Sequence, residues 1–306
     1  MTPEWRLGLF RGGPLGRRVG LRTTGGRDAA AAARIIDRPS RRIGRCAALL
    51  DQIAVRMRVG PRVADPLADV EPFLHRFLRD ADGAAFVNSS MPGRCVIALS
   101  TAGKPSYVLK IGNTDDHQLR NEGEFLTKVS GMRLPFKVPE LVYADSQGEH
   151  CVVVTRAWMQ ARRAGPLSRS ELLGITEVLG AAGTGVRPLV HGDLAPWNVL
   201  RTPGGIGVID WETATFADQP LRDLVHYLVQ AGAIMRWTDV STVVRELTHP
   251  RGMVGELAGR LGVPRSRVPE ALHTYFATSP PVHVRRVRRF RESVAAAVGV
   301  DALWQP

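Results

Sequence analysis

The sequence predicts an α+β fold with two lobes: a small antiparallel sheet, then a mostly helical part. Two observations lead to this prediction. Residues 84–155 contain short β-rich segments separated by turn sequences, and beyond residue 158 helical stretches alternate with loops. With 306 residues the chain is long enough for two cores. We divide it into a basic N-terminal extension at 1–80, partly helical or disordered, an N-lobe at 81–158 and a C-lobe at 159–306.

The N-terminal extension carries most of the net charge. Residues 1–62 contain 14 arginines and 4 acids, a net charge of +10, whereas the whole chain has +12. A basic arm can bind nucleic acid, an anionic membrane or an acidic partner. No aromatic side chains alternate with these arginines, so a solvated extension is favoured over a nucleic-acid site. A regulatory protein that uses this arm remains the alternative. It predicts salt-sensitive polynucleotide binding that is lost without residues 1–62.

Composition excludes several other classes of protein. No apolar run approaches the roughly 20 residues of a membrane span, and the start lacks the pattern of a secretory leader, so we expect a cytoplasmic location. Cys46, Cys95 and Cys151 lie far apart and form no CxxC pair. We therefore expect buried free thiols and no zinc site or disulfide framework.

The sheet is predicted from two pairs of β-rich segments. "CVIALS" and "YVLKI" flank the turn sequence "TAGKPS", and "LVYAD" and "CVVVT" flank "SQGEH". Between the two pairs, "HQLRNEGEFLTKV" has helical periodicity, and "VEPFLHRFLRD" at 70–80 resembles a short amphipathic helix. The expected buried side of the helix between the pairs comprises Leu119, Phe125, Leu126 and Val129.

The C-lobe begins with a predicted capping box, Ser168 with Glu171. Further helices are expected after Pro220, Asp239, Gly252, Ser266 and Val284. In the last helix a stripe of Val287, Phe290, Val294 and Val298 is expected to be buried. Its arginines, 285, 286, 288, 289 and 291, are expected to lie mostly on a solvated surface.

The segment "LVHGDLAPWNVLRTPGGIGVIDWE", residues 189–212, concentrates acidic and amide oxygens. "NVL" and "IGVID" flank the turn "RTPGG", and this hairpin would bring Asp210 alongside Asn198, with Asp193 at the front of the same loop. Like charges this close are costly unless a cation lies among them. Carboxylate and amide oxygens are hard ligands that suit Mg²⁺. The pattern therefore predicts magnesium on a bound nucleotide.

"HGDLAPWN" followed by "VIDWE" resembles the catalytic segment of the aminoglycoside phosphotransferase and choline kinase-like family, small-molecule relatives of protein kinases. The resemblance implies a bilobal protein kinase-like fold, ATP and Mg²⁺ as cofactors, and transfer of the γ-phosphate to a small-molecule hydroxyl. It makes Asp193 the catalytic base and His191 a brace of the loop. Asn198 and Asp210 would hold Mg²⁺, and Asp223 would anchor the helical lobe.

The resemblance also implies a nucleotide-binding role for the N-lobe. Lys110 in "YVLKI" would contact the α- and β-phosphates and pair with a helical glutamate, either Glu122 or Glu124. Donors in "NSSMPGR", among them Ser89 and Ser90, would cover the phosphates. The adenine would lie against the backbone of Arg156, Ala157 and Trp158.

The charge of the C-lobe gives an indication of the substrate. Residues 159–306 contain 17 arginines and 13 acids. An acidic cleft would bind a polycationic aminoglycoside better than a basic one. We therefore expect a neutral or anionic hydroxyl substrate, such as a sugar, a glycosylated intermediate or a neutral antibiotic. A nucleotide-binding pseudokinase is the alternative, and HGD in place of HRD disfavours a protein kinase.

Overall fold

A computed structural model describes most of the chain beyond residue 94 and short stretches before it. The described residues are 8–9, 19–23, 77, 81, 83–88, 94–102, 104–181, 188–217, 219–279 and 284–299. They fall into two compact units. The first unit ends with residues 139–161, and the second contains residues 131–138 and the chain from residue 162 onward. The predicted α+β fold is confirmed, since an antiparallel sheet precedes a helical region.

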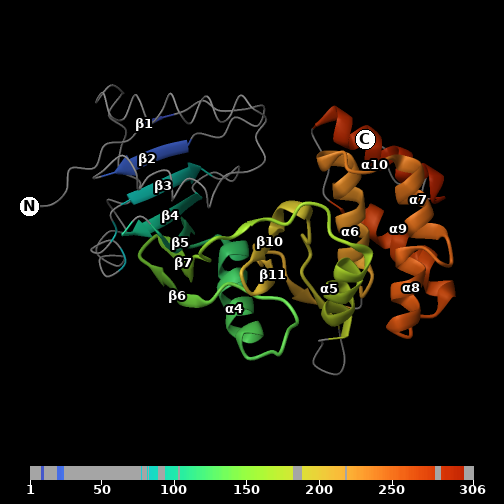
Figure 1. The fold of residues 1–306 in the computed structure, drawn as a ribbon, viewed down its shortest axis with the longest axis horizontal. Coiled ribbons are helices and arrows are strands. Elements are labelled where there is room, and N and C mark those ends of the chain that lie inside the picture. The colour runs from blue at the N-terminus through green and yellow to red at the C-terminus, as the bar shows by residue number, and fades with distance from the viewer. Residues whose placement is uncertain are drawn as a thin grey trace, which may run out of the picture. The chain divides into compact units, whose positions relative to one another are not determined.

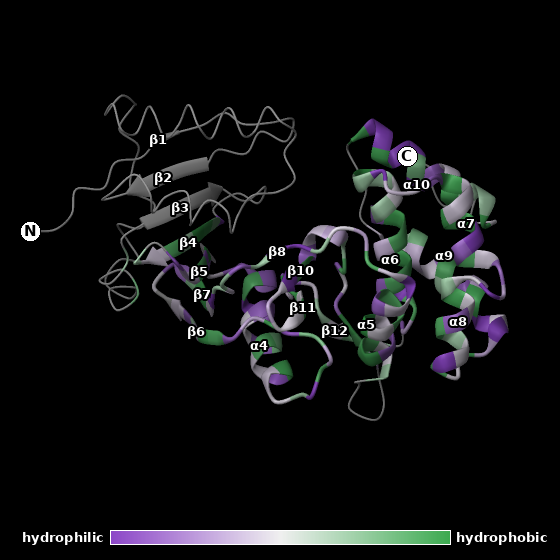
Figure 2. Ribbon diagram, in the orientation of Figure 1, coloured by the Kyte–Doolittle hydropathy of each residue, from purple (hydrophilic) through white to green (hydrophobic). Residues whose placement is uncertain are grey.

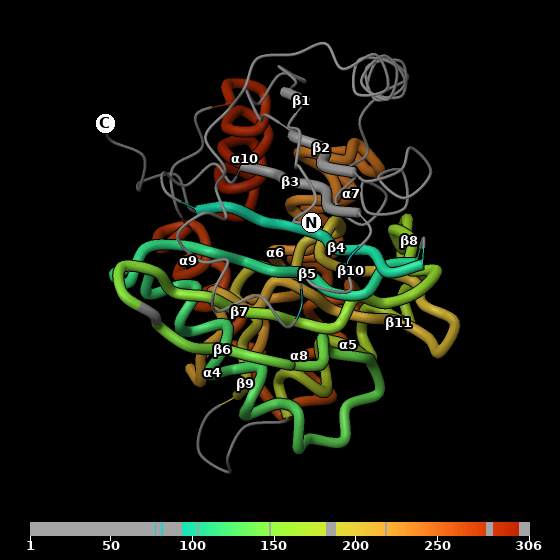
Figure 3. The backbone as a smooth tube through the Cα atoms, turned by 90° about the vertical axis from the view of Figure 1, so that its left-hand side faces the viewer, coloured from blue at the N-terminus to red at the C-terminus, as the bar shows by residue number. Residues whose placement is uncertain are grey.

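The first unit is built on one seven-stranded antiparallel sheet with the strand order β1-β2-β3-β4-β5-β7-β6. Figure 3 shows β4, β5, β7 and β6 side by side in this order. Both predicted strand pairs are confirmed, as β4–β5 and β6–β7. The strands are β1 (Gly8–Leu9), β2 (Val19–Thr23), β3 (Gly83–Asn88), β4 (Cys95–Thr101), β5 (Lys104–Asn113), β6 (Leu141–Gln147) and β7 (His150–Arg156).

Alternation along β5 separates the two faces of this sheet. Leu109 and Ile111 point into a hydrophobic core that includes Phe77. Helix α4 (His117–Ser130) packs on the opposite face, and a Cβ atom added at Gly123 would lie 2.9 Å from the Cβ of Ala144. Glycine thus lets α4 approach the sheet closely. The predicted buried residues of α4 are all buried: Leu119, Phe125, Leu126 and Val129.

The structure adds strands that the sequence did not indicate. β1 and β2 lie within residues 1–80, where we expected helix or disorder, and β2 pairs with β3. Of the helix expected at 70–80, only Phe77 belongs to the described residues. Cys46 also lies outside the described residues. Cys95 and Cys151 are buried free thiols, as predicted, and burial raises the pKa of Cys95 to about 12.

The second unit is mainly helical, and a helix begins within a few residues of each predicted position (Figure 1). The helices are α5 (Arg169–Ala181), α6 (Arg222–Gln230), α7 (Val240–Thr248), α8 (Met253–Arg260), α9 (Val268–Thr278) and α10 (Arg285–Ala297), with short turns η1 (Pro196–Asn198), η2 (Ala231–Met235) and η3 (Arg265–Arg267). Its short strands are β8 (Arg162–Arg163), β9 (Leu189–Val190), β10 (Val199–Thr202), β11 (Gly205–Val208) and β12 (Thr215–Phe216).

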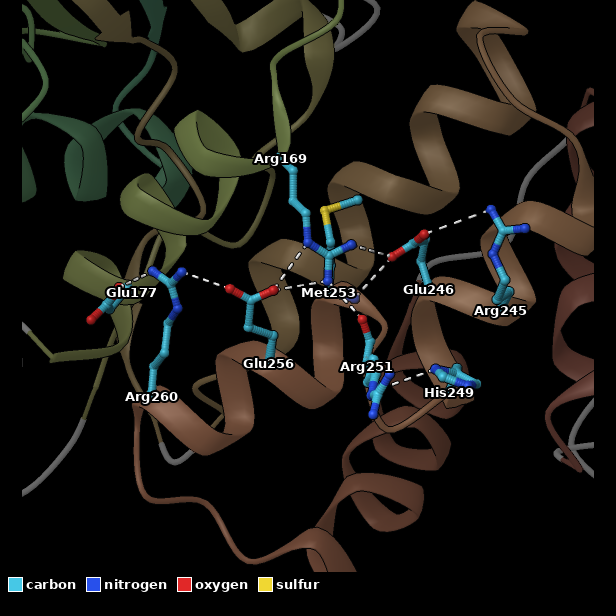
Figure 4. A network of polar contacts seen from close by, with 9 residues as sticks. All are labelled: Arg169, Glu177, Arg245, Glu246, His249, Arg251, Met253, Glu256 and Arg260. Carbon is cyan, nitrogen blue, oxygen red and sulfur yellow. Dashed lines mark hydrogen bonds and ion pairs between the residues drawn. The ribbon is translucent and has the colours of Figure 1, made fainter.

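The start of α5 is fixed by local and long-range polar contacts. The predicted capping box is present: the Ser168 N–H donates to Glu171 Oε2 at 2.9 Å, and the Glu171 N–H donates to Ser168 Oγ at 3.3 Å. Figure 4 shows Arg169 reaching α7 and α8, where it donates to Glu246 and Glu256 at 3.0 Å each. These ion pairs connect α5 with α7 and α8, although exposed pairs of this kind contribute little to stability singly.

Helix α10 follows its predicted pattern with one correction. Val287 and Val294 are buried, whereas Phe290 is only partly so. Arg291, which we expected with the surface arginines, is buried with 3% of its surface exposed. Figure 2 shows hydrophilic and hydrophobic residues together on α8, as a helix with one buried side requires. Within the described part of the chain, every helix is too short or too polar to cross a bilayer.

Candidate active site

The loop that contains His191, Gly192 and Asp193 is held by its backbone. The N–H groups of His191 and Gly192 donate to the two carboxylate oxygens of Asp223, at 2.7 and 2.9 Å. The Thr213 hydroxyl donates to the His191 carbonyl at 3.0 Å. Asp223 is buried in the first turn of α6, so the loop is tied to the helical core as expected.

Glycine is required at the centre of this loop. Gly192 has φ +82°, in the region that side chains disfavour. A Cβ atom at this position would also lie 2.5 Å from the Thr213 carbonyl oxygen. Any larger residue would therefore displace either the loop or the segment after Trp211.

His191 is fully buried beneath the loop. Its Nε2 lies 3.1 Å from the Ile209 carbonyl oxygen, and its ring centroid lies 4.7 Å from that of Trp211. Burial lowers the pKa of the imidazole and outweighs three neighbouring aspartates, whose charges act in the opposite direction. A neutral ring that donates from Nε2 to Ile209 fits this environment. His191 thus connects the loop to the end of β11 and does not face a reacting group.

Asp193 and Asn198 are brought together by the turn η1. The Asn198 side-chain amide donates to the Asp193 backbone oxygen at 2.9 Å and to its Oδ2 at 3.0 Å. These two bonds use the amide nitrogen and direct Oδ1 of Asn198 away from Asp193. Asp193 keeps 35% of its side chain exposed, so its carboxylate is both oriented and accessible.

Two residues that the sequence analysis missed complete the environment of Asp193. His226 Nε2 of α6 lies 2.9 Å from Asp193 Oδ1, and the Tyr275 hydroxyl of α9 lies 3.2 Å from His226 Nδ1. Burial raises the pKa of Tyr275 to about 12, so the phenol keeps its proton. All donors are satisfied when Tyr275 donates to Nδ1 and His226 donates from Nε2 to Asp193.

A sequence signal existed for only one of these two residues. His226 follows Asp223 by three residues, a spacing that places both side chains on one side of a helix. Because Asp223 was already singled out as an anchor of the helical lobe, His226 could have been considered with it. Tyr275 lies on another helix, 49 residues from His226, and nothing in its neighbourhood indicates the contact.

The β10–β11 hairpin positions Asp210 as predicted. The Ile209 N–H donates to the Asn198 carbonyl at 2.9 Å, so Asp210 directly follows the residue that pairs with Asn198. Asp210 has φ +73°, a strained value that Asp tolerates better than most residues. Carboxylate oxygens of Asp210 and Glu212 lie within 4.8 Å of one another. Asn198, Asp210 and Glu212 therefore offer hard oxygen ligands from neighbouring backbone positions.

In the first unit, Lys110 pairs with a glutamate of α4. Lys110 Nζ lies 2.6 Å from Glu122 Oε2, and the side chains are 16% and 2% exposed. Of the two alternatives, Glu122 is thus the partner, whereas Glu124 lies 3.6 Å from Lys128 on the surface. The close approach at Gly123 brings Glu122 to the face of the sheet on which Lys110 lies.

The loop expected to cover the phosphates is only partly described. Ser89 and Ser90 lie outside the described residues. Arg94, at the end of the loop, is buried and donates from Nε to Asp116 Oδ2 at 2.7 Å. Burial would raise the pKa of Asp116, but Arg94 and the Leu119 N–H together lower it. Asp116 is therefore a charged cap that fixes Arg94 against the start of α4.

The segment expected to contact adenine has its first two amides engaged. The Arg156 N–H donates to the Glu140 carbonyl and the Ala157 N–H to the Ser106 carbonyl, both at 2.9 Å. The Arg156 guanidinium also pairs with the Glu140 carboxylate at 3.1 Å, which raises the pKa of Arg156. Neither amide is offered to a nucleotide in this arrangement. Recognition through this segment would use a carbonyl group or Trp158.

Comparison with known proteins identifies the segment around the loop. Residues 184–258 match the model of the phosphotransferase enzyme family. The predicted resemblance is thereby confirmed for the segment that contains Asp193, Asn198, Asp210 and Asp223. None of the curated proteins is significantly similar to the chain in sequence.

Solved aminoglycoside phosphotransferases also align with the chain. A ternary complex of a thermostable mutant of APH(4)-Ia with ADP and hygromycin B is 16% identical with a TM-score of 0.47, and the alignment covers 77% of this chain and 99% of that one. The streptomycin–ATP–APH(2")-IIa complex is 11% identical with a TM-score of 0.43, covering 70% and 89%. ADP-bound APH(2'')-Ib is 11% identical with a TM-score of 0.44, covering 76% and 99%.

Proposed function

We propose that this protein is an ATP-dependent phosphotransferase that transfers the γ-phosphate to a hydroxyl of a small molecule. Its residues 184–258 match the phosphotransferase enzyme family. The observation that carries this proposal is the environment of Asp193, within the matched segment. Its two carboxylate oxygens each accept one hydrogen bond, from His226 and from Asn198, while the side chain remains accessible.

Asp193 is the proposed catalytic base. Each of its oxygens has a lone pair left after these hydrogen bonds, and this lone pair can accept the proton of a substrate hydroxyl. The two bonds hold the carboxylate in one orientation, and positioning of this kind is most of what phosphoryl transfer requires from a protein. His191 has a supporting role, because it is buried and bonded to Ile209.

The proposed Mg²⁺ ligands are Asn198 and Asp210. Their chemistry fits the ion: Asn198 turns its amide nitrogen toward Asp193 and leaves a hard amide oxygen, and Asp210 adds a carboxylate. When bound, Mg²⁺ and ATP supply the transferable phosphoryl group and the neutralisation of its charge. Glu212 and the buried Trp211 support the position of Asp210.

The first unit is proposed to bind the nucleotide. The Lys110–Glu122 ion pair holds an ammonium in a fixed position, as a contact to α- and β-phosphates requires. Ser89 and Ser90 would add donors to the phosphates, and the backbone at Arg156, Ala157 and Trp158 would contact the adenine. The acceptor is proposed to be a neutral or anionic hydroxyl compound, because arginines outnumber acids in residues 159–306.

The test is a screen for nucleotide hydrolysis and acceptor phosphorylation with Mg²⁺, comparing wild type with Asp193→Asn. Removing a general base should lower the transfer rate by about 10²- to 10⁴-fold while nucleotide affinity stays close to that of wild type. Asp239→Asn is the matched control, because Asp239 caps α7 and Asn caps helices equally well.

Two results would contradict the proposal. Equal transfer rates for wild type and Asp193→Asn would remove Asp193 from the chemistry. Nucleotide binding without transfer to any acceptor would favour the pseudokinase alternative. Selective turnover of a polycationic aminoglycoside would overturn the proposed substrate class but not the reaction.

A further inference from the structure

Helix α10 packs against η2 and α7 in the second unit (Figure 1). Basic side chains line a shallow cavity at this contact. Its volume is about 350 Å³, and it is widely open to solvent. Arg236 and Thr238 line it from the segment that follows α6. Arg286, Arg289 and Ser293 line it from α10. Three arginines and two hydroxyl-bearing residues thus line the cavity from two elements.

Two of the three arginines that line this cavity, Arg236 and Arg289, have no carboxylate partner within the part of the chain that the structure describes. Other arginines of the same unit do: Arg201 lies 2.7 Å from Glu171, and Arg288, a neighbour of Arg289, lies 3.7 Å from Glu292. We expected the arginines of α10 to form a solvated face, and Arg286 and Arg289 are exposed as expected. Together with the exposed Arg236 they line the cavity.

The backbone holds this arrangement in place. Residues Ala231–Met235 form a π-helical turn, a feature often found at functional sites. Arg236 ends the turn in the left-handed conformation, with φ +60°. Phe290 packs so closely on Gly232 that a Cβ atom there would clash with its ring. The cavity therefore combines an apolar wall with a rim of arginines.

We propose that this cavity binds the oxyanion group, a phosphate or a carboxylate, of the acceptor substrate. Guanidinium groups bind such oxyanions through paired charge-assisted hydrogen bonds, and hydroxyl groups can supply further donors. This assignment rests on the proposed function. It adds that the acceptor substrate carries an oxyanion group at a distance from its reacting hydroxyl.

The position of the cavity suits this role. His226 of α6 contacts Asp193, and α6 continues directly into η2. Ala233, which lines the cavity, follows His226 by seven residues, about two helical turns and roughly 10 Å along the axis. An acceptor of metabolite size can therefore present a hydroxyl to Asp193 and an oxyanion to the arginines.

The first test measures binding of inorganic phosphate at constant, low ionic strength by calorimetric titration. Wild type is compared with the double variant Arg236→Gln/Arg289→Gln, with the matched control Arg288→Gln, and with Lys110→Met. We expect the Kd for phosphate to rise about tenfold or more in the double variant and to change less than about twofold in Arg288→Gln, whereas Lys110→Met shows whether phosphate also binds at the nucleotide site. No phosphate binding by wild type, or equal Kd values for wild type and the double variant, would overturn the proposal.

The Lys110→Met arm keeps this result separate from the proposed function. If Lys110→Met loses phosphate and the double variant retains it, phosphate occupies the nucleotide site, and the cavity proposal fails while the phosphotransferase proposal stands. The second test uses acceptors found by ADP release. We expect the double variant to raise KM at least tenfold for an anionic acceptor, with kcat little changed. An unchanged KM with weakened phosphate binding would instead assign the cavity to a separate anionic effector.

Discussion

Replacing Asp223 by alanine should destabilise the second unit by about 3 kcal/mol. The carboxylate accepts the N–H groups of His191 and Gly192 at 2.7 and 2.9 Å and is 4% exposed. A buried N–H left without an acceptor costs about 1–3 kcal/mol. The His191 bond is fully buried and should incur most of this cost, whereas water can reach the partly buried Gly192 amide and reduce it. Loss of an acid from the first turn of α6 adds about 0.5 kcal/mol.

The assay is urea unfolding followed by circular dichroism, with hydrogen exchange at the amides of His191 and Gly192. Asp239→Ala is the control, because Asp239 also accepts a backbone N–H, from Thr242 at 2.7 Å, but at an exposed helix start. Its loss should destabilise the second unit less than the loss of Asp223 does, because the cap is exposed to water. Equal destabilisation by the two substitutions, or unchanged exchange at His191 and Gly192, would refute the argument that Asp223 holds the loop.

Three further predictions test other contacts. Arg201 and the Ser168 cap lower the pKa of Glu171 from 4.5 to about 2. The charged Glu171 therefore stabilises the fold above about pH 4.5, and this stabilisation is lost as the pH falls toward 2. Acid unfolding of Glu171→Gln should depend less on pH in this window. If His226 and Tyr275 orient the carboxylate of Asp193, His226→Gln should lower kcat by up to about a hundredfold with the nucleotide KM unchanged. Tyr275→Phe should lower kcat by a smaller factor. A change in KM alone would contradict this role. Lys110→Met should weaken ATP binding about tenfold or more in a titration, and unchanged affinity would exclude a phosphate contact.

Sequence reasoning succeeded where one local signal fixes the geometry. The β-rich segments "NVL" and "IGVID" with a glycine turn between them predict a hairpin, and the structure pairs Val199 with Val208. The buried stripe of α4 follows from helical spacing. The pairing of Lys110 with a helical glutamate came from the family resemblance, and the structure decides between Glu122 and Glu124. Strands of two residues, such as β8 and β12, contain no periodic pattern and depend on pairing with distant segments.

The candidate site was predicted less completely than the fold. A contiguous motif contains Asp193, Asn198 and Asp210, so the sequence could assign them together. Tyr275 reaches the site only because α9 packs on α6, and that packing depends on the whole helical core. The arginines of α10 were judged from one helix alone. Their arrangement around a cavity depends on Arg236, which lies 50 residues before Arg286.

Helix α6 has opposite charge environments near its two ends, and the charge total of the chain does not reveal this. Its first turn carries Asp223, and His226 in the next turn contacts Asp193. Arg236 lies beyond its last turn. A polycationic acceptor would be attracted at the first end and repelled at the second, so it would not occupy the basic cavity. Its KM should then be unchanged or lower in Arg289→Gln, whereas the KM of an anionic acceptor should rise. The sign of that change distinguishes the two substrate classes, because Arg289 acts through charge at a distance from the reacting hydroxyl.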